Sequence, residues 1–491
     1  MRALPLTLSL WVLPVVAGAQ APASPPPGAQ APAVGQAPTT QPSDAQAPVA
    51  RPGATPTTPA PVKQSLSMAA SEGRVISLAE AETAAREHLP TLRSAQAGTD
   101  AARARVDQSF SSFLPQVSAN ANYTLGTSNR AVIQNVPGSD TGVVSNSTRR
   151  FSGGISANQL IYDFGRTSGR YNISKENAQA QEDSQQQVLQ DSLRDVRSAY
   201  FNVLTQKALL GVARETLQSE EARLNQVNAS VQVGTRPEID LLQQRTAKAN
   251  AQVQLIRAQN AYATAKAQLN QTMGAETSTD YTVQDVTVAA VPGEDELLDA
   301  LVLRALESRP DVAARERQVR AQELQIKVTK GGHWPSLNAT GNVSDVGENP
   351  FNGSTVSVSG GLSLSWALFQ GGLVNAQTRE ANANLRDIQA QKDALRQQVR
   401  LQVEQARLNV VATREALTAA DEAQVNARER LRLAEGRYRA GVGNIIEVSD
   451  AQVAFTNAAA QQVQATYDLA TSRAELARAL GTVELSTVAS R

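Results

Sequence analysis

The chain has 491 residues, with 46 basic and 46 acidic side chains and no cysteine. A formal net charge of zero provides no broad basic field for nucleic acid. Without cysteine there is no disulfide, no thiolate metal ligand and no cysteine nucleophile. The two histidines, His88 and His333, are far apart in the sequence. We therefore expect no metal site, no cofactor and no binding to nucleic acid.

The first residues, MRALPLTLSLWVLPVVAGAQ, have the layout of a secretory signal. One arginine precedes an apolar stretch that ends in Ala17-Gly18-Ala19. A single membrane anchor is the alternative, but the stretch is shorter than the ~20 residues that a spanning helix needs. We assign residues 1–19 to a signal peptide. Residues 20–74, rich in proline, alanine and glutamine, are expected to form a disordered linker.

The rest of the chain repeats itself. The stretch VGTRPEIDLLQQ (233–244) corresponds to AGVGNIIEVSDA (440–451), and aligning Gly234 with Gly441 gives an offset of 441 − 234 = 207 residues. The same offset aligns Met273-Gly274 with Leu480-Gly481. We therefore predict two tandem repeats, 75–281 and 282–485, followed by a tail at 486–491.

Most of each repeat has helical periodicity. Apolar side chains recur every seven residues from Val196 to Val231, and no proline occurs between residues 165 and 233. This pattern predicts a helix of ~100 Å in a coiled-coil-like pair, with a counterpart 207 residues later. Shorter helical patterns occupy 78–113, 238–273, 295–330 and 445–480. Two short helices placed end to end would match one long helix, and segment 274–294 is expected to form a small β patch.

Within each repeat the period also changes to two. Val117, Tyr123 and Leu125 alternate with polar side chains, and in 354–369 valine, leucine and tryptophan alternate with serine, glycine and alanine. The pattern predicts β-hairpins at 116–162 and 336–369, with loops at 127–148 and 344–353. Strands of about ten residues with one apolar face are typical of transmembrane barrels, and a soluble sandwich is the alternative. Four strands cannot close a barrel, so they must pair with other chains.

At this point the chain resembles the TolC-type outer membrane efflux family. The order of signal, helix, hairpin, long helix and return helix agrees with that family in both repeats. The local motifs agree as well: the family's helix signature at Leu89-Pro90-Thr91-Leu92 and Arg309-Pro310-Asp311-Val312, the strand-to-helix turn at Tyr162-Asp163-Phe164-Gly165 and Phe369-Gln370-Gly371-Gly372, and the helical tips at Gly234 and Gly441.

The resemblance implies a fold, a location and partners. The implied fold class is an α+β membrane protein. Three chains of four strands each would close a 12-stranded outer membrane β-barrel, which continues into a long α-helical periplasmic tunnel. The implied function is passive conduction in a tripartite efflux or type I secretion system of a Gram-negative bacterium. The implied partners are two further copies of the chain (a homotrimer), outer membrane lipid, a periplasmic adaptor and an inner membrane pump.

The resemblance also assigns roles to residues at the helical tips. An adaptor would dock on two turns, formed by Gly234, Thr235, Arg236 and Pro237 and by Gly441, Val442, Gly443 and Asn444. Glu447 and Asp450 match two acidic residues that line the pore entrance in the family. Because positions i and i+3 share one helix face, three chains would place six carboxylates around one axis, which favours cations. A solvated acidic helix face is the plainer interpretation.

A closed-state latch is a further implication. Tyr438 matches a family tyrosine that bonds to an aspartate on the first hairpin, here Asp240. The assisting arginine of the family falls at Gly443, so that half of the latch is missing. Tyr438 also lies in the heptad seam, where simple packing is the alternative.

Two other classes of protein are alternatives to a channel. A soluble periplasmic coiled-coil adaptor or scaffold would explain the heptads and the duplication but not the alternating strand segments. An enzyme is not expected, because the sequence contains no metalloprotease, P-loop, nucleophile-elbow or dinucleotide-binding motif.

Overall fold

The computed structural model describes residues 74–132, 142–275, 281–286, 290–348 and 355–482, all of which belong to one unit, residues 68–491. The predicted signal peptide, the linker up to residue 73, the tail at 486–491 and the centres of both strand loops lie outside these residues. The proposed domain boundaries stay a prediction.

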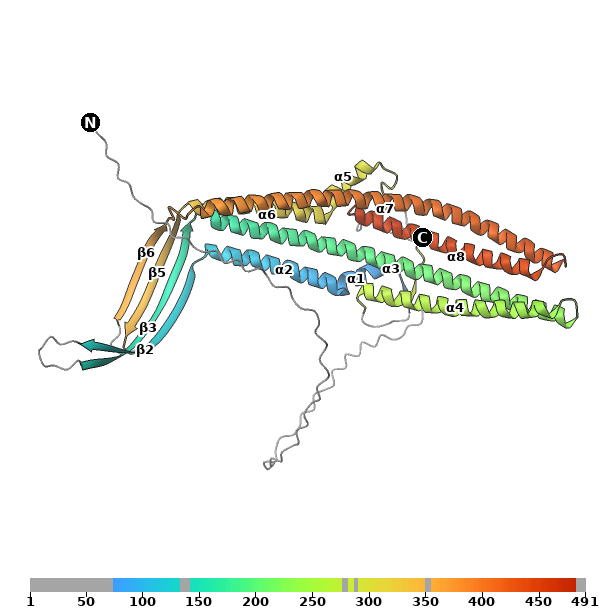
Figure 1. Ribbon diagram of the computed structural model, residues 1–491, viewed down its shortest axis with the longest axis horizontal. Helices are drawn as coiled ribbons and strands as arrows, with labels where there is room; N and C mark the ends of the chain where they lie inside the picture. Colours follow the sequence, from blue (N-terminus) through green and yellow to red (C-terminus); the bar gives the residue numbers. More distant parts are fainter. Residues whose placement is uncertain (1–73, 133–141, 276–280, 287–289, 349–354, 483–491) are drawn as a thin grey trace, which may run out of the picture. The chain divides into compact units, whose positions relative to one another are not determined.

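The described helices and strands occur in the same order twice (Figure 1). The first half contains β1 (Arg74–Ile76), α1 (Leu78–His88), α2 (Pro90–Phe110), β2 (Gln116–Val132), β3 (Gly142–Tyr162), α3 (Arg166–Gln232) and α4 (Glu238–Met273). The second contains β4 (Tyr281–Val283), α5 (Leu298–Ser308), α6 (Pro310–Lys330), β5 (Ser336–Gly347), β6 (Thr355–Ser365), α7 (Leu373–Arg439) and α8 (Ile445–Ala479). Short 3₁₀ turns, Ser111–Phe113 and Gly331–His333, lead into β2 and β5.

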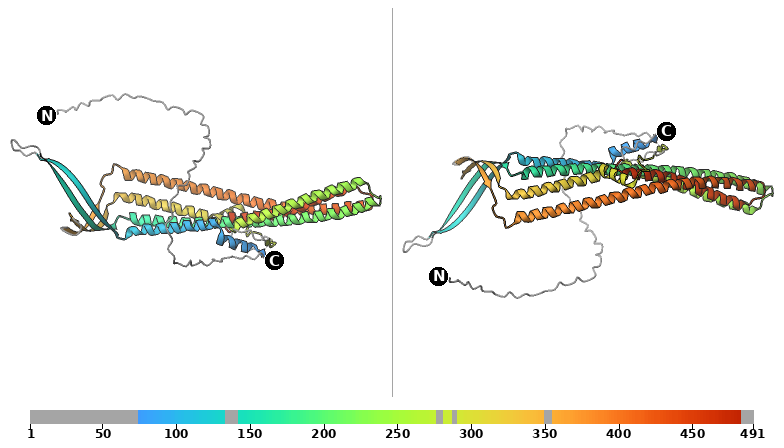
Figure 2. Two further views of the ribbon diagram at one scale, coloured as in Figure 1. Left: turned by 90° about the horizontal axis from the view of Figure 1, so that it is seen from below. Right: turned by 90° about the horizontal axis from the view of Figure 1, so that it is seen from above.

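The helices α3 and α7 are each 67 residues long, or about 100 Å at 1.5 Å per residue. Each begins after a glycine with positive φ, Gly165 at 85° and Gly372 at 83°. This conformation is accessible to glycine and turns the chain from strand into helix. The shorter α2 and α4 pack along α3, and α6 and α8 pack along α7 (Figure 1). In both views of Figure 2 the four-stranded sheet lies at one end of the helices and the two helical turns lie at the other.

The expected helices 78–113 and 295–330 are each broken into two, so the prediction of continuous helical patterns through Pro90 and Pro310 was wrong. The α1 helix ends at His88 and α2 begins at Pro90, and α5 ends at Ser308 before α6 begins at Pro310. Proline disfavours helical geometry in the residue before it but is well suited to the first helical position. The preceding residues, Leu89 and Arg309, are accordingly extended, with ψ of 120° and 126°.

These breaks form the joints at which short helices meet end to end. Gly274 follows α4 with φ of 72°, and a Cβ there would lie 2.8 Å from the carbonyl carbon and oxygen of His88. Gly481, 207 residues later, has φ of 73° and approaches the backbone of Ser308 in the same way. Both the conformation and the lack of space therefore require glycine at each joint.

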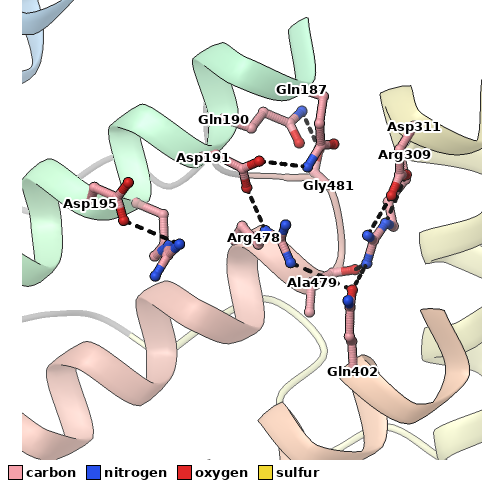
Figure 3. A network of polar contacts seen from close by, with 11 residues as sticks. Gln187, Gln190, Asp191, Asp195, Arg309, Asp311, Gln402, Arg478, Ala479 and Gly481 are labelled. Carbon is pink, nitrogen blue, oxygen red and sulfur yellow. Dashed lines mark hydrogen bonds and ion pairs between the residues drawn. The ribbon is translucent and has the colours of Figure 1, made fainter. Parts of the chain in front are cut away.

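The second joint is also tied by a polar network (Figure 3). The buried guanidinium of Arg309 donates to Asp311 at 2.6 Å, to Gln402 of α7 at 2.8 Å and to the carbonyl of Ala479 at 3.3 Å. Arg478 of α8 donates to Asp191 of α3 at 2.7 Å. The network thus joins the C-terminal end of α8 to both long helices. The first repeat has Leu89 in place of Arg309, and there Arg197 of α3 donates to Glu82 of α1 at 2.6 Å.

The segment expected as a small β patch, 274–294, contributes one described strand. β4 pairs in parallel with β1. The buried hydroxyl of Tyr200 donates to the carbonyls of Ile76 at 3.0 Å and Gln284 at 2.8 Å, which fastens the pair to α3.

The strands β2, β3, β5 and β6 form one antiparallel sheet in that order. The hairpins are confirmed, but the strands β2, β3 and β5 are longer than predicted and their loops shorter, because antiparallel pairing continues wherever neighbouring backbone groups can satisfy each other. β6 ends at Ser365, four residues earlier than expected. The indole of Trp366 donates to the carbonyl of His333 at 3.1 Å, and this contact leads the chain away from the ladder.

One face of this sheet is apolar and exposed. Ile155 of β3, Val343 of β5 and Val358 of β6 occupy neighbouring positions in one row, and their exposures are 54%, 44% and 76%. The outer strands β2 and β6 each pair on one side alone within the described sheet. An exposed apolar face between two open edges indicates a surface that another apolar phase and other strands must cover.

The helices contrast with the apolar face of the sheet. Within the described part of the chain, no helix combines the length and the hydropathy that crossing a membrane would require.

Replacement of Gly274 by alanine tests the joint. We expect the variant to lose about 1–3 kcal/mol of stability, because a left-handed conformation is strained for alanine and its Cβ would press on His88. The measurement is the thermal midpoint of the purified protein in detergent. Gly211→Ala is the control, since a Cβ there meets nothing within 4 Å inside α3; it should be neutral or slightly stabilising. Equal loss in both variants would contradict this account of the joint.

Candidate functional site

The two helical turns are built alike. At the first, the amide of Thr235 donates to the carbonyl of Ser230 at 3.0 Å, and at the second, the amide of Val442 donates to that of Arg437 at 3.1 Å. Gly234 and Gly441 hold the left-handed position between them, with φ of 74° and 76°. This is the glycine-dependent way of ending a helix while satisfying its last carbonyls.

Each turn then starts its return helix differently. Pro237 occupies the cap position before α4, whereas the side chain of Asn444 accepts a hydrogen bond from the amide of Ile446 at 3.2 Å before α8. Val233 and Val442 are 74% and 71% exposed at the two turns. The eight residues predicted as adaptor-binding tips therefore lie at one end of the long helices, with an apolar side chain exposed at each turn.

The space around Gly443 explains why this position does not hold an arginine. A Cβ at Gly443 would lie 2.9 Å from the amide nitrogen of Tyr438 and 3.0 Å from the carbonyl carbon of Arg437. Such distances leave no room for any side chain without moving backbone. The second turn is therefore folded too tightly against α7 to present a residue larger than glycine here.

Arg236, on the first turn, supplies a guanidinium from the other hairpin. It lies 4.2 Å from the centre of the Tyr438 ring and donates to the backbone carbonyl of Tyr438 at 2.8 Å. Contacts of this kind contribute about 0.5–2 kcal/mol, more where water is excluded. The sequence predicted Arg236 only as part of a docking turn. Its contact with α7 depends on how the two hairpins pack.

The expected pairing of Tyr438 with Asp240 is present in the structure. The Tyr438 hydroxyl donates to Asp240 Oδ2 at 3.5 Å, and both residues are buried. This distance is long for a hydroxyl donor, so the bond itself is weak. Tyr438 also packs in an apolar cluster with Val227, Leu241 and Val448. Packing, the arginine and the aspartate therefore all hold this tyrosine between the hairpins.

Burial raises the pKa of the Tyr438 phenol above its ordinary value of 10.0, and the negative charge of Asp240 raises it further. The positive charge of Arg236 opposes both effects. The three groups are therefore electrostatically coupled as well as in contact.

Glu447 and Asp450 follow the second turn at the start of α8. Glu447 is partly exposed and Asp450 is exposed. Arg437, the neighbour of Tyr438, places its Nε 3.6 Å from Glu447 Oε1. This exposed pair is weak on its own, but it offsets part of the Glu447 charge. No described residue forms an ion pair with Asp450.

A buried polar network lies further along the same helices. Arg223 of α3 donates to Glu220 at 3.1 Å, to Glu435 of α7 at 2.8 Å and to Gln452 of α8 at 3.1 Å. Gln244 of α4 donates to the carbonyl and carboxylate of Glu220. The four helices therefore share one polar cluster, next to the apolar cluster of Val227, Leu241, Tyr438 and Val448 that also joins both hairpins. Polar contacts between the hairpins exchange with water more readily than apolar packing does.

With this geometry in hand, the comparisons with known proteins identify the family. The model of the family described as outer membrane efflux protein matches residues 83–275 and 301–482. The chain is 26% identical over 440 residues to the outer membrane protein TolC of Escherichia coli (strain K12), covering 85% of each chain. It is 26% identical over 420 residues to the protein CyaE of Bordetella pertussis, covering 84% of this chain and 85% of that one.

Solved structures agree on the fold. The CusC structure gives a TM-score of 0.70 at 19% identity and covers 82% of this chain and 92% of that chain. The CmeC outer membrane channel of Campylobacter jejuni gives 0.68 at 19% identity, with coverage of 83% and 86%.

The chain belongs to the outer membrane efflux protein family. The resemblance inferred from its sequence is confirmed, and so is the fold class of a shared β-barrel that continues into a helical tunnel. The protein is an outer membrane efflux channel of a Gram-negative bacterium, and it extends into the periplasm. The soluble adaptor is not supported, and the family consists of channel proteins.

The pKa of Tyr438 tests the coupling at the turns. Asp240→Asn should lower the pKa, because it removes a negative charge next to the phenol. Arg236→Gln should raise it, because it removes a positive charge. The pKa is read from ultraviolet absorbance during alkaline titration, as the difference between each protein and its matching Tyr438→Phe variant. An unchanged pKa in both variants would show that burial alone sets it, and shifts of the same sign would contradict the opposing effects of the two charges.

Proposed function

We propose that three copies of this chain assemble into one conduit. An inner membrane pump, connected through a periplasmic adaptor, would pass its substrate into that conduit. The observation that carries this proposal is the separation of two surfaces by the long helices. The sheet, with its exposed apolar face and two open edges, lies at one end. The two helical turns lie at the other end, together with the acidic first residues of α8. Three sheets joined at their edges satisfy the backbone groups that lipid cannot.

The adaptor would dock on the two turns. Each presents an exposed valine beside a glycine turn, and each lies on a helical hairpin that a second coiled coil could extend. A relative supports this role. The solvent efflux pump outer membrane protein SrpC of Pseudomonas putida is 25% identical to this chain over 321 residues.

Glu447 and Asp450 would line the entrance of the conduit. They share one face of α8 beside the turn, and Asp450 is exposed to solvent. Six carboxylates around one axis attract cations and repel anions. Arg437, which the sequence did not single out, would moderate the charge of Glu447.

The group of Arg236, Tyr438 and Asp240 would keep the entrance narrow. It connects the first turn and α4 to α7 and thus ties one hairpin to the other. Opening the entrance requires the hairpins to move apart, so this group must separate before a wide solute passes. Arg236 replaces, from the opposite hairpin, the arginine that Gly443 excludes.

Removal of the carboxylates tests the entrance. The double variant Glu447→Gln/Asp450→Asn should lower the ratio of cation to anion permeability in planar bilayers by roughly two-fold or more, because the fixed negative charge is lost. Glu404→Gln, an exposed carboxylate on α7 far from the turns, is the control. Arg437→Gln should act in the opposite direction, because it frees the Glu447 charge. An unchanged ratio in the double variant would place these carboxylates away from the conducting path.

The Arg236 contact is tested by conductance. Arg236→Gln should raise single-channel conductance, since the loss of about 0.5–2 kcal/mol per chain favours separation of the hairpins. Arg428→Gln is the matched control: Arg428 lies 5.7 Å from the ring centre of Phe455, but both residues belong to the α7–α8 hairpin. Equal conductance in the two variants would remove the link between hairpins from the mechanism.

A further inference from the structure

Two adjacent arginines on β3 face opposite sides of the sheet. Successive residues of a strand alternate in direction, so Arg149 lies on the apolar face, opposite Leu125, and Arg150 lies on the polar face, opposite Thr124. Both side chains are exposed. In a barrel whose apolar face meets lipid, Arg149 points outward and Arg150 points into the lumen.

Within the described four-stranded part of the sheet, the lumen-facing side is otherwise uncharged. The pairing of Gln116 with Asn158, of Asn158 with Thr340 and of Thr340 with Gly361 fixes which residues share that face. Its described positions from 116 to 126, 148 to 160, 336 to 346 and 355 to 365 carry serine, threonine, asparagine, glutamine, glycine, Leu160, Val346 and a single charge, Arg150. No described residue forms an ion pair with Arg150.

The register places Arg150 at the outer rim of the membrane. The pairing of β3 with β5 ends at Phe151 and Gly347, so Arg150 lies one residue beyond the four-stranded part of the sheet, on the side far from the helices, where only β2 and β3 continue as a pair. The eight residue steps from Asn158 to Arg150 rise about 20 Å when the strands tilt by about 40°. The pair of Tyr123 and Phe151 lies one row below on the lipid-facing side, where barrels carry an aromatic girdle.

The expected geometry brings these charges close to the axis. Twelve strands about 4.8 Å apart and tilted by about 40° enclose a backbone radius of about 12 Å. An extended arginine reaches roughly half of that distance. Each guanidinium therefore lies within one Debye length of the axis, which is about 10 Å at 0.1 M salt.

We propose that three Arg150 side chains form a cationic ring inside the outer mouth of the barrel, which attracts anionic solutes and binds multivalent anions. This inference rests on the trimeric conduit proposed above. The ring is in series with the carboxylates of the entrance and has the opposite sign. The lumen between them at membrane level is lined by neutral hydroxyl and amide groups, so the mouth has its own selectivity for charge.

The test uses planar bilayers at about 0.1 M salt or below, where the charges are not screened. The parent is the full-length trimer carrying Glu447→Gln/Asp450→Asn, so that the entrance no longer dominates the selectivity. Adding Arg150→Gln should reduce the anion-to-cation permeability ratio by about two- to three-fold. Arg149→Gln removes the same charge from the same strand but from the lipid-facing side and should leave the ratio unchanged. Arg150→Lys should retain the parent ratio.

A second measurement uses inositol hexakisphosphate, added to the side of the outer mouth. It should reduce the current through the parent and through the Arg149→Gln variant, but not through Arg150→Gln. Equal effects of Arg149→Gln and Arg150→Gln, or no effect of Arg150→Gln, would overturn the ring. These outcomes differ from failure of the proposed conduit, in which the parent trimer itself would conduct no ions.

Discussion

The unsatisfied edges of a four-stranded sheet are the constraint on which the rest of this protein depends. Backbone amides and carbonyls cannot remain unpaired in lipid, and the described sheet leaves β2 and β6 open on one side. Its exposed apolar face is unfavourable in contact with water. Closure by identical chains satisfies both demands at once, and it brings three sets of helices onto one axis. The tunnel is thus a consequence of how the sheet is completed.

The helices below the sheet solve a problem of length. A helix of 67 residues needs partners along its full extent, and each repeat supplies them as two shorter helices joined end to end. The joint needs a glycine that accepts positive φ and close backbone contact, together with a proline that restarts the helix. The second joint adds the buried Arg309 network (Figure 3). The C-terminal end of α8 is therefore fixed to both long helices, while its N-terminal end meets the first hairpin through the apolar cluster of Val227, Leu241 and Val448 and through the polar contact of Gln452 with Arg223.

Charge is distributed unevenly along the conduit, and this follows from small differences between the repeats. The carboxylate pair belongs to the second turn, since the first has Gln243 where the second has Asp450. The tight second turn excludes a side chain at Gly443, and Arg236 of the first turn takes up the contact with Tyr438. The two hairpins thus share one design, and single-residue differences decide where the carboxylate pair and the contact of Arg236 with Tyr438 lie.

The sequence by itself determined the repeat, the strands, the long helices and their turns, because these depend on local periodicity and on residues with restricted backbone geometry. Heptads, alternation and glycine act within one element and can be recognised without knowing its neighbours. The breaks at Pro90 and Pro310 were also encoded locally, but the apolar spacing on either side obscured them. Only the tertiary structure decided which charges meet. Arg236 and Tyr438 are 202 residues apart, and Arg309 reaches Gln402 and Ala479 across three helices. Side chains that pair across packed elements leave no periodic trace, since their spacing in the chain is set by the lengths of everything between them.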